Sequence, residues 1–199
     1  MPYYKNYAAS SGRVHNVAKH EDAVEGALLE EGFNKLELKI SKNQRDAWLQ
    51  GKTSEEIPND SFICQPCGTH NSPDFIVKEN NRVFFIECKS SKQTHPTYNS
   101  GLPDPNYIYI FCSSSTNETT FYLGKDVLDK ESHAKITEYL NERRKIDDKF
   151  NDILSGLDVN QRGFSFYTRP MYNQKGKNKN YFTHPSRWQC EKKVLKHVM

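Results

Sequence analysis

Two short apolar segments in the first half of the chain, Phe75–Val77 and Val83–Ile86, flank a polar stretch. That stretch, Lys78–Arg82, contains the adjacent turn formers Asn80 and Asn81. Short runs of β-branched and aromatic residues joined by a few turn residues are typical of a β-hairpin. The pattern therefore predicts two paired strands over this part of the chain.

Further strands are predicted from apolar runs of two kinds. Phe33 to Ile40 alternates, because Leu36, Leu38 and Ile40 share one face of an extended chain. Tyr107 to Cys112 is apolar throughout, which is typical of a buried central strand. Shorter runs predict strands or strand-like segments over three more ranges: Ser61–Gln65, Thr120–Leu123 and Phe164–Tyr167.

Apolar residues at helical spacing predict four helices. In the first, Val14–Glu31, apolar positions recur every three to four residues, and Gly32 follows as a C-cap. The other three ranges are Ser41–Gly51, Leu128–Leu157 and Trp188–Val198. The order of elements predicts an α/β fold, a mixed β-sheet flanked by helices. We expect one domain over residues 1–199, with a core over 14–125 and a helical extension over 126–199 that does not fold independently.

Composition restricts the classes of function. The chain has 199 residues, a net charge of +3 and 27% charged residues, so a nucleic-acid surface has to be a local basic patch. Five cysteines form an odd, irregular set, which argues against a secreted disulfide framework. No signal-like start or long apolar segment is present, so we expect a soluble, cytoplasmic protein in a reducing compartment, without a membrane partner.

Charged residues stand at the ends of the predicted hairpin strands. Asp74 begins the first strand, and Glu87 and Lys89 end the second. Side chains two apart on a strand point the same way, and pairing of the strands brings Asp74 close to them. Two carboxylates at a sheet edge are suited to Mg²⁺, which binds one or two carboxylates and retains several waters. Mn²⁺ is the expected substitute.

The pattern Pro73-Asp74 followed by Glu87-Cys88-Lys89 resembles the active site of the PD-(D/E)XK nuclease superfamily. The segments Gln65-Pro-Cys-Gly and Asn99-Ser-Gly-Leu-Pro, and the apolar strand after them, are similar to those of type II restriction endonucleases. The resemblance covers about residues 14 to 112. It implies a restriction-endonuclease-like fold and Mg²⁺ held by Asp74, Glu87 and the backbone carbonyl of Cys88. Lys89 would then orient or deprotonate the attacking water.

A carboxylate lies on the apolar stripe of the first predicted helix. Glu21 falls between Val17, Val24 and Leu28, and a charged group on a core-facing stripe is unusual unless something satisfies it. Enzymes of the resembled superfamily commonly carry a Glu on the helix before the sheet. Glu21 matches that place best and Glu25, one turn later, is the alternative, for an outer shell or a second metal.

Cys64 and Cys67 form a single CxxC pair. A zinc site would need further ligands, with His70 and His95 as the candidates, and no second pair follows at finger spacing. A redox pair would need a strand-to-helix context that is missing here. We therefore expect a turn that leads the chain to Asp74, and no structural zinc.

Candidate DNA contacts lie in two loops. The loop after the catalytic hairpin contains Lys92 and Asn99. The second loop, residues 173–180, is basic, lacks apolar residues and has aromatic and basic neighbours, a composition suited to phosphate and base contacts. Its candidates are Arg169, Tyr172, Lys175, Lys177, Lys179 and Arg187.

These features together predict a Mg²⁺-dependent endonuclease that cuts double-stranded DNA at specific sequences, as type II restriction enzymes do, and that acts as a homodimer. Two alternatives stay open. One is a Holliday-junction resolvase or repair nuclease of the same fold, and the other is a DNA-binding protein without catalysis.

Overall fold

The centre of the molecule is an open six-stranded sheet with strands in the order β1-β2-β3-β4-β5-β6. The computed structural model describes residues 17–52, 57–69, 71–98, 101–168, 172 and 174–199. The strands are β1 (Asn34–Leu36), β2 (Ser61–Cys64), β3 (Phe75–Glu79), β4 (Arg82–Ser91), β5 (Ile108–Ser113) and β6 (Glu118–Leu123). Strands β1 and β2, and β4 and β5, are parallel, and the other neighbours are antiparallel, so the sheet is mixed.

The hairpin β3–β4 turns at Asn80 and Asn81. Both residues have positive φ, at 49° and 61°. Asn tolerates this left-handed conformation better than most residues, and two such residues in a row match the twist of the flanking strands. The turn sets Phe75 opposite Ile86 and Glu79 opposite Arg82. The predicted hairpin is confirmed, and β4 extends two residues further than predicted.

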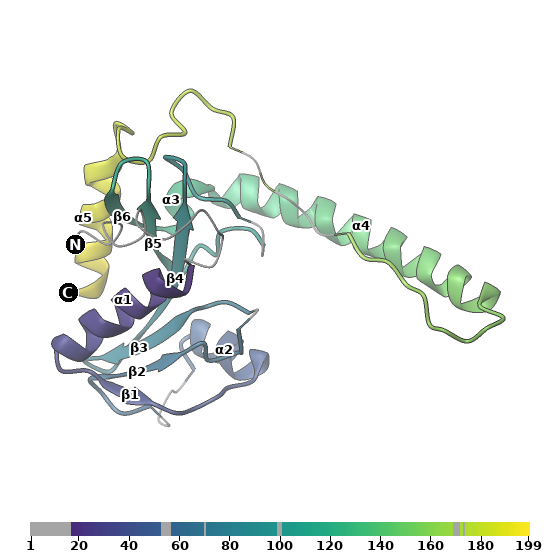
Figure 1. Ribbon diagram of the computed structural model, residues 1–199, viewed down its shortest axis with the longest axis horizontal. Coiled ribbons are helices and arrows are strands. Elements are labelled where there is room, and N and C mark those ends of the chain that lie inside the picture. Colours follow the sequence, from purple (N-terminus) through teal and green to yellow (C-terminus); the bar gives the residue numbers. More distant parts are fainter. Residues whose placement is uncertain (1–16, 53–56, 70, 99–100, 169–171, 173) are drawn as a thin grey trace.

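Helices cover both faces of the sheet, and one helix leaves it (Figure 1). The helices are α1 (Val17–Glu30), α2 (Lys42–Leu49), α3 (Gly124–Val127), α4 (Lys130–Leu157) and α5 (Arg187–Val198). On one face Val24 of α1 and Val194 of α5 join a buried cluster with Phe62, Phe75 and Phe84. On the other face Trp48 of α2 joins a second cluster that contains Phe111 and Phe182. The mixed α/β architecture is thereby confirmed.

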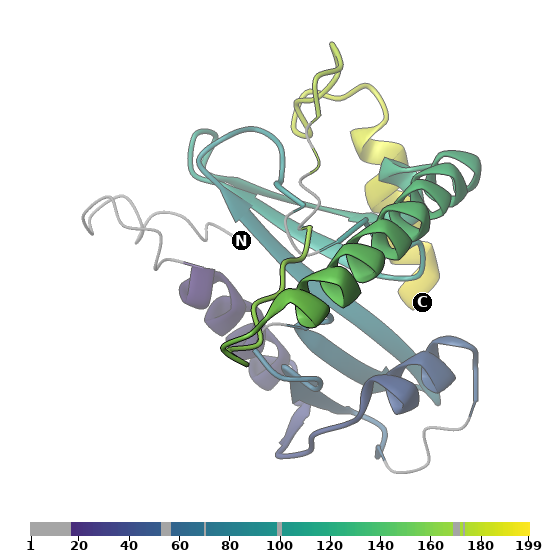
Figure 2. The ribbon, with the colours of Figure 1, turned by 90° about the vertical axis from the view of Figure 1, so that its right-hand side faces the viewer.

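Helix α4 projects from this body as an arm (Figures 1 and 2). Asp129 caps its first turn, because the side chain accepts a hydrogen bond from the backbone N–H of Ser132. None of the side chains of α4 is fully buried. With 28 residues the helix is about 42 Å long.

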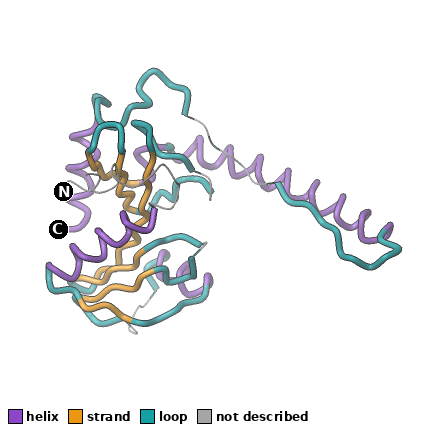
Figure 3. The backbone as a smooth tube through the Cα atoms, viewed as in Figure 1, coloured by secondary structure: helices purple, strands orange, loops and turns teal. Residues whose placement is uncertain are grey.

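The predicted strand over Phe164–Tyr167 is wrong. Residues 158–168 instead form an irregular strap that runs back along α4 (Figure 3). The side chain of Asn151 donates to the carbonyl of Phe166 and accepts from its N–H. Nearer the body, Thr168 donates to both carboxylate oxygens of Asp147. A helix side chain, and not a neighbouring strand, thus satisfies the backbone of this segment.

The other predicted helices and strands are present with shifted boundaries, and the predicted start of the first helix, residues 14–16, lies outside the described residues. The predicted strand over 33–40 is reduced to β1, and a capping box between Ser41 and Gln44 starts α2. The last two predicted helices correspond to α4 and α5. Among the residues that the structure describes, no helix is long and apolar enough to cross a bilayer.

Candidate functional site

The strand register brings the first two predicted carboxylates together. Phe75 pairs with Ile86, so the next positions along the two strands, Asp74 and Glu87, face each other. The backbone N–H of Cys88 donates to Oδ2 of Asp74 over 2.7 Å. This hydrogen bond fixes the Asp74 side chain against β4. Cys88 thus contributes its N–H here, whereas the sequence predicted a role for its carbonyl.

Glu87 and Lys89 form the second part of the site. They lie on the same face of β4, and Nζ of Lys89 donates to Oε1 of Glu87 over 2.7 Å. Glu87 is buried, and its other oxygen, Oε2, has no hydrogen-bond partner among the described residues. A buried carboxylate oxygen without a partner costs roughly several kcal/mol in desolvation free energy, unless a donor or a cation binds it.

Burial and like charge disturb the acidity of this group of residues. Burial, followed by the negative charge of Glu87, raises the pKa of Asp74 to about 7. The hydrogen bond from Cys88 and the ammonium of Lys89 act in the opposite direction and are outweighed. Two carboxyl groups this close do not both ionise easily near neutral pH. A cation between them would remove the conflict.

Glu21 belongs to the same electrostatic group. Burial and the charge of Glu87 raise its pKa, against a hydrogen bond from Gln65. That bond runs from Nε2 of Gln65 to Oε2 of Glu21 over 3.1 Å. Helix α1 therefore directs Glu21 toward the strand ends that carry Asp74 and Glu87. Sequence reasoning missed Gln65, which directly follows β2 and has a positive φ of 43°.

Glu25, the alternative helix carboxylate, has other partners. Its oxygens accept hydrogen bonds from Nζ of Lys35 over 2.8 Å and from the thiol of Cys64 over 3.3 Å. The ammonium of Lys35 lowers the pKa of Glu25. The geometry thus separates the two candidates and places Glu21 with Asp74 and Glu87.

The surroundings of Cys64 and Cys67 favour protonated thiols. Burial and the hydrogen bond to Glu25 raise the pKa of Cys64 to about 12, so the thiol stays protonated. Burial also raises the pKa of Cys67. Gly68 and Asn71 close a tight loop after the pair through backbone hydrogen bonds to Gln65 and Gly68. The turn predicted before Asp74 is present, and His70 lies outside the described residues.

A small cavity of about 130 Å³ opens beside Glu87 and Lys89. Arg45 of α2 reaches it, and Nη1 of Arg45 donates to the backbone carbonyl of Ser72. Two tyrosines of the following strand region, Tyr107 and Tyr109, line its inner wall. Nothing in the sequence around Arg45 indicated this position, because α2 and the hairpin are distant in sequence.

Hard oxygen ligands make this site suited to a divalent cation such as Mg²⁺ or Mn²⁺. The unpartnered Oε2 of Glu87 and the carboxylate of Asp74 are the ligand atoms that such ions prefer. Within the described part of the chain, no three His, Cys, Asp or Glu side chains are grouped closely enough to hold a metal without rearrangement. In the observed arrangement Lys89 occupies Oε1 of Glu87 and leaves Oε2 open.

The structure brings the two predicted DNA loops side by side. The N–H of Tyr181 donates to the carbonyl of Thr94, and Nε2 of Gln174 donates to the carbonyl of Pro96. Burial lowers the pKa of His95, and the nearby ammonium of Lys179 adds to this shift. The exposed lysines of the joined loops are Lys92, Lys175, Lys177 and Lys179. Asn99 and Arg169 lie outside the described residues.

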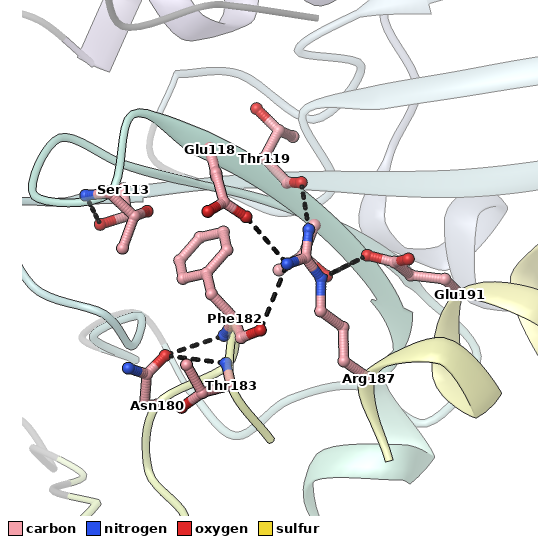
Figure 4. Close-up of polar contacts among 10 residues, drawn as sticks. Ser113, Glu118, Thr119, Asn180, Phe182, Thr183, Arg187 and Glu191 are labelled. Atoms are coloured by element: carbon pink, nitrogen blue, oxygen red, sulfur yellow. Dashed lines mark hydrogen bonds and ion pairs between the residues drawn. The ribbon is translucent and has the colours of Figure 1, made fainter. Parts of the chain in front are cut away.

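Two residues that were predicted to contact DNA have partners within the fold. Arg187 forms ion pairs with Glu118 and Glu191 and donates to the carbonyls of Phe182 and Thr119 (Figure 4). The guanidinium thereby ties α5 to β6, which leaves it unsuited to contact a phosphate. Tyr172 is half-buried, and its ring packs against the core while its hydroxyl is buried. Sequence composition could not distinguish these residues from the exposed lysines.

Comparison of the chain with protein-family profiles, with curated proteins and with solved structures finds no match.

Proposed function

We propose that this protein is a Mg²⁺-dependent endonuclease of the PD-(D/E)XK type that hydrolyses phosphodiester bonds in double-stranded DNA. The observation that carries the proposal is the convergence of Asp74, Glu87 and Lys89 on one face of the β3–β4 hairpin. The unpartnered oxygen of Glu87 and the raised pKa of Asp74 support a cation site there. The mixed sheet between helices supports a restriction-endonuclease-like fold.

The residues of the site have separable roles in this proposal. Asp74 and Glu87 would hold the divalent cation, with the Cys88 carbonyl as a further ligand and Glu21 in an outer shell. A bound divalent cation supplies charge relief at phosphorus and a more acidic water. Lys89, now paired with Glu87, would orient the attacking water and stabilise negative charge on the phosphate oxygens.

The DNA would approach over the joined loops. Lys92, Lys175, Lys177 and Lys179 are exposed and carry positive charge toward solvent. Such lysines neutralise phosphates and provide affinity that falls with salt concentration. We also propose that the protein cuts DNA at specific sequences and acts as a homodimer, as type II restriction enzymes do.

A plasmid digest tests the proposal. The purified chain is incubated with supercoiled plasmid and Mg²⁺, beside Asp74→Asn as the inactive variant and Asp148→Asn, exposed on the arm, as its control. Discrete fragments from the wild type and the control, and none from Asp74→Asn, are expected. Cutting confined to branched DNA would favour a resolvase. A retained gel shift without any cleavage would leave only the DNA-binding alternative.

Metal binding is tested separately from activity. A ligand that binds only the folded state raises the melting temperature. Mg²⁺ or Mn²⁺ is expected to raise that of the wild type and of Asp148→Asn, and to leave that of Asp74→Asn unchanged. An equal shift in all three proteins would contradict cation binding at Asp74.

A further inference from the structure

The arm carries an apolar stripe that no other part of the described chain covers. Its exposed members are Tyr139, Ile146, Phe150, Ile153 and Leu157, each between 47% and 69% exposed. Large apolar side chains in a row on one helix are unusual on a soluble surface and mark sites of association. The exposed stripe therefore marks the arm as a candidate site of association, separate from the site on the sheet.

The spacing of the stripe is that of a coiled coil. Starting at Ile136, the positions advance alternately by three and four residues through Tyr139, Arg143, Ile146, Phe150, Ile153 and Leu157. This is the a and d pattern of a seven-residue repeat, with Ile136, Arg143, Phe150 and Leu157 at a. A helix face with this period is suited to another helix that packs knobs into holes along it.

The strap touches the stripe at Arg143 and leaves its large apolar side chains exposed. It contacts Asn151 and Asp147, which lie on the flank next to the a positions. It also draws away the one charge within the stripe, since Nη2 of Arg143 donates to Oγ1 of Thr168 and Nη1 donates to the hydroxyl of Tyr139. The opposite flank, which carries Glu142 and Lys149, stays exposed.

Nucleic acid is a poor partner for this arm. Helix α4 contains six basic residues (Lys and Arg) and six acidic residues (Asp and Glu), so it has no net charge apart from His133. A phosphate backbone would require an excess of Lys and Arg. An apolar seam with mixed charges at its borders is instead typical of a helix that pairs with another protein helix.

The charges at the border of the seam select a second copy of the same arm in the antiparallel direction. In that arrangement Ile136 packs against Ile153 of the other copy and Tyr139 against Phe150. The same register places Glu142 opposite Lys149 of the other copy, twice by symmetry. A shift by one repeat in either direction sets Lys149 against Lys149 or Glu142 against Glu142, which repels.

A parallel pairing is disfavoured by the same residues. It would place the two Arg143 side chains at one level of the seam. It would also set Glu142 of each copy beside Asp147 of the other, and like charges across a coiled coil weaken it. Only the antiparallel register gives opposite charges along the open flank.

We infer that the arm is a self-association device: two copies of this chain pair through their α4 helices in an antiparallel coiled coil with two-fold symmetry. The pairing is isologous, so each arm supplies the same patch to the other. It sets the tip of each arm beside the body of the other copy, where α4 begins. The inference does not depend on the nuclease chemistry, because none of the catalytic residues lies on α4.

Sedimentation equilibrium of the full chain across the micromolar range tests the inference. A dimer is expected for the wild type. Ile146→Asp places a charge in the middle of the seam, and we expect it to raise the dimer dissociation constant by about 100-fold or more. Asn141→Asp adds the same side chain on the opposite face of the helix and is expected to leave the constant unchanged. A monomeric wild type, or equal effects of the two variants, would overturn the inference.

A charge exchange tests the direction of pairing and does not depend on how Ile146→Asp folds. Glu142→Lys is expected to weaken the dimer about five-fold, because Lys then faces Lys149 of the other copy. The double variant Glu142→Lys with Lys149→Glu is expected to restore it. In a parallel dimer Glu142→Lys would face Asp147 and strengthen association, and that result would overturn the antiparallel arrangement.

Discussion

The β3–β4 hairpin and the arm depart from ordinary burial in opposite directions. In the hairpin, charged groups are inside, since Glu87 is 6% exposed and its Oε2 has no partner among the described residues. On the arm, apolar groups are outside, since Ile146 is 55% exposed. Both arrangements cost free energy in an isolated chain.

The two departures differ in what would relieve them. The hairpin offers carboxylate oxygens around a small space and requires a compact positive charge. The arm offers a long apolar stripe with alternating border charges and requires another helix. A protein tends to break a local rule where it functions, and the two partners that we propose, a cation and a second copy, would each relieve one of these regions.

The largest expected effect is on the free energy of unfolding, when an aromatic side chain is removed from the core and, for comparison, from the arm. Phe111 is fully buried against the rings of Tyr181 and Phe182, whereas Phe150 is 49% exposed on α4. Phe111→Ala is expected to lower the free energy of unfolding by about 3–5 kcal/mol, measured by urea denaturation. Phe150→Ala is expected to change it by less than about 0.5 kcal/mol in dilute protein.

Varying the protein concentration is the control for the comparison of Phe111→Ala with Phe150→Ala. Phe150→Ala should lower the stability of concentrated samples more than that of dilute ones, because it acts on the dimer. If Phe150→Ala destabilised dilute protein as much as Phe111→Ala, the arm would belong to the core and the comparison would fail.

The next effect concerns the ammonium beside Glu87. Lys89→Met removes the charge and keeps most of the length of the side chain. We expect the rate of plasmid cleavage under saturating Mg²⁺ to fall by about 10²–10³-fold, which corresponds to about 3–4 kcal/mol of activation free energy. Lys192→Met, at an exposed position of α5, is the matched control. A Lys89→Met rate within a factor of two of the control would exclude a catalytic role for Lys89.

The β3–β4 hairpin could be predicted because the residues that determine it are close together in the sequence. Apolar strands, the Asn80-Asn81 turn and the alternation of side chains fix the register, and the register alone brings Asp74 to Glu87. The two-residue spacing of Glu87 and Lys89 then determines their shared face. The sequence therefore predicted the centre of the site, while Gln65 and Arg45, which reach it from distant segments, were missed.

The arm could not be predicted in the same way. Helical spacing over 128–157 predicted a helix correctly, but an apolar stripe in a sequence does not reveal whether the body covers it. Phe164–Tyr167 alternated like a strand, and the bonds from Asn151 and Asp147 hold this segment as a strap. Likewise, composition predicted a phosphate contact for Arg187, whereas in the structure its guanidinium forms ion pairs with Glu118 and Glu191. Which partner a charged side chain takes depends on tertiary contacts.

A smaller effect is expected at the joined loops. Replacing Lys175, Lys177 and Lys179 together by Gln removes three exposed positive charges. If all three contact phosphates, the slope of log affinity against log salt should fall by about 2.7 in size, and affinity at moderate salt by about 30-fold. Fluorescence anisotropy with a labelled duplex measures both. A triple exchange of Lys130, Lys135 and Lys145 on the arm should leave the slope unchanged, and an equal loss would move the DNA surface to α4.

The smallest effect is the pH dependence of stability at Asp74. Its pKa is raised from 3.8 to about 7 in the folded protein, so the folded state binds the proton more tightly than the unfolded state. Protonated Asp74 therefore contributes to the free energy of unfolding. This contribution is complete below pH 4 and is lost as the pH rises toward the pKa of Asp74 in the folded state. Between pH 6 and pH 8 the unfolded carboxyl is already ionised, and the loss in this window is about 1.4 kcal/mol.

Asp74→Asn isolates this contribution, because the amide cannot ionise and its oxygen can still accept from the Cys88 N–H. The free energy of unfolding of the variant should exceed that of the wild type by a margin that grows from pH 6 to pH 8, measured by urea denaturation in metal-free buffer. Titrating groups that do not interact with Asp74, such as distant histidines, cancel in the difference. Mg²⁺ at pH 8 should reduce the margin, because it stabilises only the wild type. A margin that is independent of both pH and Mg²⁺ would mean that Asp74 is an ordinary hydrogen-bond acceptor. The buried carboxylates of the hairpin would then not require a cation, and only the exposed apolar stripe of the arm would still require a partner.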